Sequence, residues 1–312
     1  VYLTRGAALT KAIVVKKRGA APSLVVAPIE REIAQTAGLP IILNTKYGHR
    51  DLLYEYNGDA LAAYVAYVQR ILADHDITQG RVGFYGTEDS GRAYMFLKAL
   101  QEAFDADGES SSNPCIEVVG EFENAVITEA RAIKDRREVA RIQAVGQRTV
   151  AIVKQTLTFL QTHKVGTDEV LYKPGGGALT VGDVHAHIHH LILQQGLEDT
   201  EGFIFATGRD AGIPHNKGTL EAPMRLGESI IFDIFPQEPR GGYFFDMTRT
   251  FCLGYAPDPV MRLYEDVQAC QHAAQQALKV TVPTGEKQRM MCECFQERGH
   301  PTLAAQPDTL EG

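Results

Sequence analysis

The sequence lacks the features that direct a protein into a membrane. No apolar run approaches the roughly 18 residues that a membrane-spanning helix requires. The opening segment, residues 1–5, lacks the pattern of a signal peptide. We therefore expect no membrane association. The chain also lacks an initiator Met, which predicts that it is processed or trimmed.

Cysteine is scarce in this sequence. The five cysteines are odd in number and include no Cys-x-x-Cys pair. We therefore expect no disulfide framework and assign the protein to the reducing cytoplasm. Cys292 and Cys294 could bind a soft metal together, but without a second pair we interpret them as ordinary thiols.

Positive charge is also in short supply. The chain carries 31 Lys and Arg residues against 39 Asp and Glu residues, a formal net charge of −8. A net acidic chain is a poor candidate for general nucleic-acid binding, so no nucleic-acid partner is expected. Hydrophobic residues at 44% and charged residues at 22% exclude disorder as the dominant state. A length of 312 residues exceeds one ordinary core and indicates two domains.

Short strands alternate with helices in the first part of the chain. Runs of β-branched residues predict strands at residues 12–15, 24–27, 40–43 and 81–86. Asp59 precedes apolar residues at steps of three and four, which predicts a helix with Asp59 as its N-cap. A second helix follows through residues 94–104. The first part is therefore expected to be a small α/β domain.

The pattern changes near residue 127, where we place the boundary between domains of residues 1–127 and 128–312. A long apolar helical pattern begins at Thr128, and residues 134–138 within it are interpreted as a solvated face. The later part predicts a helix at residues 180–196, strands at 203–205, 229–235 and 243–253, and a helix that Asp258 caps.

Four histidines gather between residues 185 and 190. On a helix His185 and His189 lie on one face and could share a zinc ion. No Glu intervenes in a His-Glu-x-x-His arrangement, however, and short motifs often match by chance. We therefore favour a helix with partly exposed histidines over a metal site.

Two aspartates stand among apolar residues in neighbouring predicted strands. Side-chain alternation puts Asp233 on one face of the first strand and Asp246 on one face of the second. The Pro- and Gly-rich segment between them predicts a hairpin. Two carboxylates that face each other repel unless a divalent metal or a shared proton offsets the charge. Solvent-exposed positions are the alternative, which the surrounding Phe and Ile residues disfavour.

The register of this hairpin sets how close the carboxylates come. Pairing Phe235 with Tyr243 or with Phe244 would fix it. The Phe244 pairing makes Asp233 and Asp246 direct partners, with Cβ atoms about 4.5–5.5 Å apart. We therefore predict that the two carboxylates converge within reach of one cation.

Four segments follow one another in an order that is typical of one family. They are residues 133–138, residues 179–183, the Pro-His segment at residues 212–216, and the hairpin that ends in Asp-Met-Thr-Arg-Thr-Phe at residues 246–251. Together they resemble the creatinase/aminopeptidase (pita-bread, M24-type) metallopeptidase family, over nearly the whole chain. The resemblance implies an α/β (α+β) fold, with a small creatinase-type N-terminal domain followed by a pita-bread catalytic domain.

The resemblance also implies a site for two divalent metal ions, Mn²⁺, Co²⁺, Fe²⁺ or Zn²⁺. The family holds them with two Asp, one His and two Glu. Asp233 and Asp246 match the two Asp, and His215 matches a His that contacts the substrate carbonyl oxygen without binding metal. The remaining His and both Glu have no match up to Gly312. We therefore expect them beyond Gly312, and expect residues 1–312 alone to be inactive.

What the resemblance implies about function is hydrolysis of peptide bonds beside proline by an Xaa-Pro dipeptidase or aminopeptidase P-like enzyme. A metal-bound water would be the nucleophile, and short proline-containing peptides would be the substrates. We expect a cytoplasmic homodimer. Two alternatives stay open: a creatinase-like C–N hydrolase that works without metal, and a non-hydrolytic binding protein of the same fold.

Overall fold

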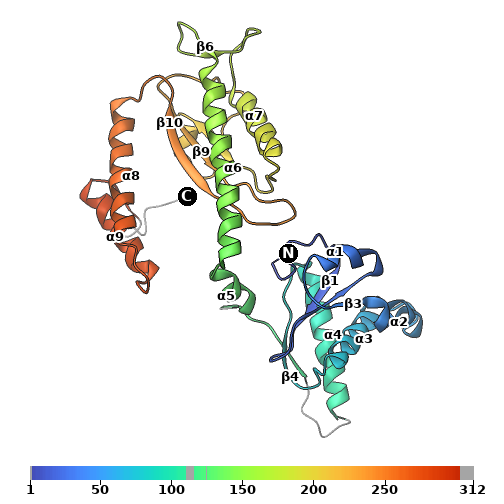
Figure 1. The fold of residues 1–312 in the computed structure, drawn as a ribbon. Coiled ribbons are helices and arrows are strands. Elements are labelled where there is room, and N and C mark those ends of the chain that lie inside the picture. The colour runs from blue at the N-terminus through green and yellow to red at the C-terminus, as the bar shows by residue number, and fades with distance from the viewer. Residues whose placement is uncertain (1, 110–115, 124, 303–312) are drawn as a thin grey trace. The chain divides into compact units, whose positions relative to one another are not determined.

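The computed structural model describes residues 2–109, 116–123 and 125–302 (Figure 1). The chain divides into two compact units, one of Val1–Val145 with Gln237–Phe244 and one of Gly146–Pro236 with Phe245–Gly312. A long helix begins in the first unit and ends in the second. The domain boundary expected after residue 127 stays a prediction.

Among the described residues of the first unit, the strands form two small sheets. β1 (Ala12–Val15) runs antiparallel to β2 (Ser23–Val26), and β2 runs parallel to β3 (Ile41–Leu43). β4 (Gly80–Gly83) and β5 (Ile116–Val119) form a separate parallel pair. The four strands predicted from β-branched runs are therefore confirmed, to within a few residues at their ends.

Helices enclose the apolar core of the first unit. They are the 3-10 helices η1 (Pro28–Glu30) and η2 (Asn44–Tyr47), and α1 (Arg31–Gln35), α2 (His49–Glu55), α3 (Ala60–Asp74) and α4 (Ser90–Glu109). α3 begins as predicted, because the Asp59 carboxylate accepts the backbone N–H groups of Leu61 and Ala62, each at 3.0 Å. Ile71 of α3 and Leu100 of α4 lie in the same buried cluster. The predicted apolar face of α3 is thus in the core.

The single long helix expected near the start of the second domain is interrupted, so that prediction is wrong. α5 (Val126–Ala132) ends before Ile133, which is extended, and α6 (Arg136–Gln161) begins after Asp135. The Asp135 carboxylate accepts the backbone N–H groups two and three residues on, at 2.8 and 2.9 Å. The Glu138 carboxylate accepts the N–H of Asp135 at 2.6 Å. This capping box starts a new helix, which apolar spacing alone does not reveal.

An antiparallel sheet of three strands, in the order β10-β9-β8, forms the centre of the second unit. The strands are β8 (Ile204–Thr207), β9 (Ser229–Ile234) and β10 (Met247–Cys252), and α7 (Val181–Gln194) contacts β8. Phe205 and Phe232 are buried on one face of the sheet. β10 begins four residues later than predicted, because only an isolated bridge pairs the residues before it.

The second unit also contains short strands and a pair of helices. The short elements are β6 (Lys164–Val165), β7 (Leu171–Tyr172) and the 3-10 helix η3 (Asp210–Gly212). α8 (Asp258–Gln276) and α9 (Thr284–Glu297) contact each other. Asp258 is the first residue of α8 rather than its cap, since Pro257 occupies the N-cap position.

A disulfide joins α8 to α9. Cys270 and Cys294 form this bond, with their Cα atoms 5.8 Å apart. The sequence predicted no disulfide framework and ordinary thiols at Cys292 and Cys294; this one bond shows that the second prediction is wrong for Cys294. The two cysteines stand 24 residues apart, and only the packing of the two helices shows that they are neighbours.

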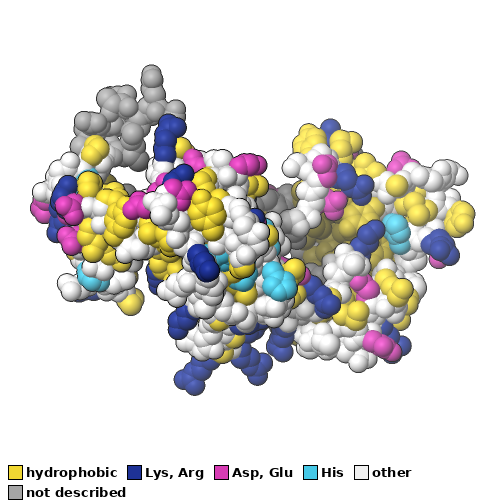
Figure 2. Space-filling view, turned by 90° about the horizontal axis from the view of Figure 1, so that it is seen from above, with side chains coloured by type: hydrophobic (Ala, Val, Ile, Leu, Met, Phe, Trp, Pro, Cys, Tyr) yellow, Lys and Arg dark blue, Asp and Glu magenta, His cyan; other side chains and the backbone are white. Residues whose placement is uncertain are grey.

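The described surface mixes both signs of charge. Acidic and basic side chains are interspersed over much of the face seen in Figure 2, so the net negative charge does not collect into one acidic area there. Within residues 2–109, 116–123 and 125–302, no helix is both long enough and apolar enough to cross a bilayer.

Candidate active site

The β9–β10 hairpin places Asp233 and Asp246 on the same face of the sheet, in a register that differs from the predicted one. Asp233 pairs with Thr248, and a bridge between Gln237 and Phe244 continues this register beyond the strands. Both pairings considered from the sequence are therefore wrong. The two aspartates are diagonal neighbours, for which a separation of about 7–8 Å is usual, rather than direct partners.

The turn that closes the hairpin explains this register. Arg240 and Gly241 adopt left-handed backbone conformations, with φ of 64° and 72°. They allow a tight turn between Glu238 and Tyr243, where the N–H of Glu238 donates to the carbonyl oxygen of Tyr243 at 2.9 Å. Pairing between the two strands therefore continues further toward the tip of the hairpin than the Pro and Gly content of the connecting segment indicated.

Thr248 orients one of the two carboxylates. Its hydroxyl donates to Oδ1 of Asp233 at 2.6 Å. Asp233 is partly buried and Asp246 is exposed, whereas Phe232 and Ile234 on the opposite face are buried. The predicted alternation of β9 is confirmed, and its polar face is accessible to an ion or a substrate.

The Asp233 carboxylate affects the ionisation of Asp246. Burial raises the pKa of Asp246, and the negative charge of Asp233 and a hydrogen bond to it raise that pKa further. Because Asp246 is exposed it keeps much of its hydration. A bound cation would offset the charge of Asp233, and this cause of the raised pKa of Asp246 would then be removed. Convergence of the two carboxylates within reach of one cation stays a prediction, and the strands pair in a register that differs from the expected one.

The donor set fits one divalent cation better than two. The carboxylates of Asp233 and Asp246 are suitable oxygen ligands for such an ion. Within the described residues, however, no group of three or more His, Cys, Asp and Glu side chains is arranged to hold a metal. A second ion would need donors other than those that the described chain brings together.

His215 lies on the turn that follows β8 and η3. It is exposed and has a left-handed backbone conformation, with φ of 61°. A non-glycine residue in this conformation costs on the order of 1–3 kcal/mol and persists only where its surroundings enforce it. Such strain is common at functional sites, although it does not by itself assign a function.

Asp210 enforces the conformation of this turn. Its carboxylate accepts the backbone N–H and the hydroxyl of Thr219 at 2.9 and 2.7 Å, and the side-chain amide of Asn216 at 3.1 Å. Among the described residues, His215 makes no hydrogen bond or ion pair of its own. Its predicted place over the two aspartates stays a prediction.

His185 and His189, which the sequence places on one face of a helix, have separate partners. Nε2 of His185 lies near the carbonyl oxygens of Phe205 and Lys217. Nδ1 of the exposed His189 is 3.4 Å from a carboxylate oxygen of Asp199. These contacts agree with the interpretation of the segment as a helix with partly exposed histidines.

Four side chains that sequence reasoning missed fasten the hairpin turn, and we call them the turn clamp: Glu138, Arg141, Glu238 and Tyr243. Nη2 of Arg141 is 2.6 Å from Oε2 of Glu238, and its guanidinium lies 4.9 Å from the Tyr243 ring centroid. The Tyr243 hydroxyl donates to Glu138 at 2.5 Å. Burial, followed by this hydrogen bond, raises the pKa of Tyr243 to about 12.

Residues 134–137 are exposed, which agrees with the interpretation of this segment as a solvated face, whereas Glu138 at its end is partly buried and belongs to the turn clamp. Glu138 both caps α6 and binds a tyrosine 105 residues further along the chain. No local pattern marks such a pair. The sequence shows a tyrosine beside two glycines in a charged turn, but this pattern does not indicate which residue the tyrosine contacts.

Arg141→Ala is expected to loosen the turn. The substitution leaves the mostly buried Glu238 carboxylate without its guanidinium, a loss on the order of 1–3 kcal/mol. Hydrogen–deuterium exchange of the amides at residues 237–244 should therefore rise about tenfold or more. Arg136→Ala, at an exposed position of the same helix, is the matched control. Unchanged exchange in Arg141→Ala would contradict the clamp.

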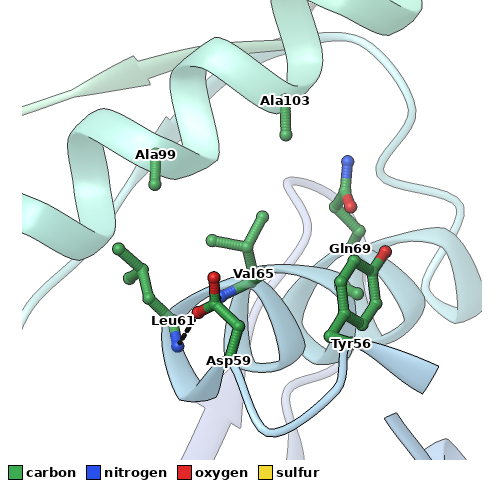
Figure 3. A pocket seen from close by; sticks show the side chains of 9 residues that line it. Tyr56, Asp59, Leu61, Val65, Gln69, Ala99 and Ala103 are labelled. Atoms are coloured by element: carbon green, nitrogen blue, oxygen red, sulfur yellow. Dashed lines mark hydrogen bonds between the residues drawn. The ribbon is translucent and has the colours of Figure 1, made fainter. Parts of the chain in front are cut away.

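A hollow of about 330 Å³ lies in the first unit between α3 and α4 (Figure 3). Small apolar side chains form much of its wall, including Leu61, Val65, Ala99 and Ala103. The Asp59 carboxylate at its edge is engaged by the backbone N–H of Leu61, as the dashed line shows. None of the predicted site residues lines this hollow, so the hairpin remains the candidate site.

Comparison with known proteins agrees with a peptidase fold. Residues 140–306, more than half of the chain, match the model of metallopeptidase family M24, and the chain therefore belongs to that family. The resemblance stated from the sequence is confirmed. No curated protein sequence matches the chain.

Solved structures share the fold at low sequence identity. An Xaa-Pro dipeptidase from Bacillus anthracis has a TM-score of 0.67 and 16% identity, covering 93% of this chain and 68% of that chain. A prolidase from Pyrococcus furiosus has a TM-score of 0.59 and 20% identity, covering 92% and 68%. A histidine variant of Escherichia coli aminopeptidase P has a TM-score of 0.58 and 17% identity, covering 95% and 64%. The predicted fold, a small α/β domain followed by a pita-bread domain, is confirmed.

Proposed function

We propose that the protein hydrolyses peptide bonds beside proline in a metal-dependent reaction. The proposal is supported by the position of Asp233 and Asp246 on one face of the hairpin, where the charge of Asp233 raises the pKa of Asp246, in a chain of a peptidase family. The substrate class is supported by structural relatives that are named as an Xaa-Pro dipeptidase, a prolidase and an aminopeptidase P. A homodimer that acts on short proline-containing peptides is part of the proposal. So is a cytoplasmic location, where the Cys270–Cys294 pair would be reduced.

Asp233 and Asp246 would hold the divalent cation, and Thr248 would keep the first of them oriented through its 2.6 Å hydrogen bond. Mn²⁺, Co²⁺, Fe²⁺ and Zn²⁺ all accept carboxylate ligands. When bound, the cation polarises a carbonyl group and lowers the pKa of a coordinated water. The family resemblance implies two such ions, and these two carboxylates suffice for one.

His215 would act on the substrate rather than on the metal. Its imidazole is exposed and makes no hydrogen bond within the described chain, so it is available to donate to a substrate oxygen. A donor placed where negative charge develops on the carbonyl oxygen stabilises the transition state. The Asp210 network would hold this donor in a strained but fixed turn.

The test is hydrolysis of Xaa-Pro dipeptides by the full-length gene product with added Mn²⁺. Xaa-Pro substrates should be cleaved at least about tenfold faster than matched Xaa-Ala substrates, and a chelator should abolish cleavage of both. Cleavage that survives chelation would favour a metal-free hydrolase. Metal binding without any cleavage would favour a binding protein.

A further inference from the structure

His185 links two segments on which the proposed active site depends. Its Nε2 is 3.0 Å from the carbonyl oxygen of Lys217 and 3.2 Å from that of Phe205. Phe205 belongs to β8, which pairs with the strand that carries Asp233. Lys217 follows His215 by two residues in the same turn. One imidazole therefore connects the turn that carries His215 to the sheet that carries Asp233.

The chemistry of its partners sets the proton arrangement of His185. Carbonyl oxygens accept hydrogen bonds and cannot donate them, so Nε2 must carry a proton. Burial lowers the pKa of His185, and the nearby His189 and Lys217 act in the same direction, against the two backbone hydrogen bonds. The ring packs on Phe203 with centroids 4.8 Å apart. Nε2 is a donor in either protonation state, so the contact does not depend on pH.

The turn lies directly against β8 at the carbonyl group that His185 binds. Gly218 has φ of 94°, and a Cβ at this position would lie 2.5 Å from the carbonyl oxygen of Phe205. Nζ of Lys217 donates to the carbonyl oxygen of Glu201 at 3.2 Å. The backbone of the segment after His215 therefore packs against β8 at Gly218, and the Lys217 side chain holds the segment through its hydrogen bond. His185 supplies the hydrogen-bond donor between this turn and β8.

We propose that His185 is a positioning residue, which holds the His215 turn against β8 through Nε2–H and so sets where His215 stands. The catalytic consequence of this role rests on the proposed function, whereas the bracing of the turn does not. A neighbouring histidine on α7, in contrast, contacts a residue of its own helix. His190 is exposed, and its Nε2 lies 2.8 Å from the side-chain amide of Gln194 in the same helix.

Hydrogen–deuterium exchange of the full-length gene product tests the brace without any substrate. His185→Phe keeps an aromatic ring and removes the donor, so amides at residues 212–219 should exchange about tenfold faster. His185→Gln supplies a donor and should recover part of the protection. His190→Phe is the control and should match the wild type. Equal exchange in His185→Phe and wild type overturns the proposal.

A second pair of variants covers the case in which His185→Phe does not fold. Met matches Gln in length but has no N–H donor, so His185→Met and His185→Gln differ chiefly in the hydrogen bond. Faster exchange at residues 212–219 in His185→Met than in His185→Gln is expected. The same exchange in both overturns the role of Nε2–H.

Turnover distinguishes a positioning role from a purely structural one. With Xaa-Pro dipeptides, the donor-less variants should lose about tenfold or more in kcat, with KM and bound Mn²⁺ unchanged, and His185→Gln should be partly active. An active enzyme whose kcat is insensitive to His185→Met overturns the positioning role. A wild type that binds Mn²⁺ but cleaves no substrate contradicts the proposed function instead. In that case the exchange experiment tests whether His185 holds the turn against β8.

Discussion

Asp246→Asn is expected to abolish metal binding and peptide hydrolysis together in the full-length gene product. Asn keeps the size of the side chain but removes one of the two negative charges on this face of the hairpin. Bound Mn²⁺, measured by elemental analysis after gel filtration, should fall to the background level. Hydrolysis of Xaa-Pro dipeptides should fall at least about 100-fold, because the cation supplies several kcal/mol of transition-state stabilisation.

The same substitution should stabilise the metal-free fold near neutral pH. The pKa of Asp246 is raised in the folded chain. At pH values above the ordinary Asp range, the folded state therefore binds more protons than the unfolded state. Wild-type stability is therefore lost as pH rises through the folded-state pKa, and the neutral Asn avoids this loss. The urea midpoint of the variant should exceed that of the wild type at pH 7, with no difference at low pH.

A matched control and one clear outcome decide the role of the carboxylate. Asp258→Asn changes an exposed carboxylate at the start of α8 and should keep both metal and activity. If Asp246→Asn retained the bound Mn²⁺ of the wild type, Asp246 would not be a ligand. The metal site would then have to be built from other side chains.

Local sequence patterns predicted most elements of the fold but not their pairing. The alternation of buried and partly exposed residues in β9 is a property of six consecutive residues, and it places Asp233 correctly on the polar face. The register, in contrast, depends on left-handed backbone at Arg240 and Gly241. Arg has no strong preference for that conformation, so the composition of the turn does not show where it closes.

Contacts between distant residues account for the rest of what the sequence did not show. The turn clamp joins Arg141 to Glu238 across 97 residues, and a disulfide joins Cys270 to Cys294. His185 resembles its neighbours on α7 in sequence, and only its distance to two carbonyl oxygens distinguishes it. The local sequence around each of these residues does not indicate its partner, which follows from the three-dimensional fold alone.

His215→Ala is expected to lower kcat about 100-fold or more while the bound Mn²⁺ stays at the wild-type level. The reason is that its imidazole, exposed and free of hydrogen bonds in the described chain, is available to stabilise charge on a substrate oxygen. Loss of metal in proportion to activity would instead make His215 a ligand. The measurement is kcat and metal content on the same samples, with His190→Ala as the control at an exposed position of α7.

The backbone of His215 adds a second, independent readout to this prediction. Its φ of 61° costs a non-glycine residue on the order of 1–3 kcal/mol, and glycine adopts the same conformation without that cost. His215→Gly should therefore be at least as stable as the wild type, although it increases the freedom of the unfolded chain. It should also lose as much kcat as His215→Ala. Greater stability with lower activity is the expected pattern for a residue that is held in strain for its function. A His215→Gly protein with a much lower melting temperature would show instead that the imidazole supports the fold.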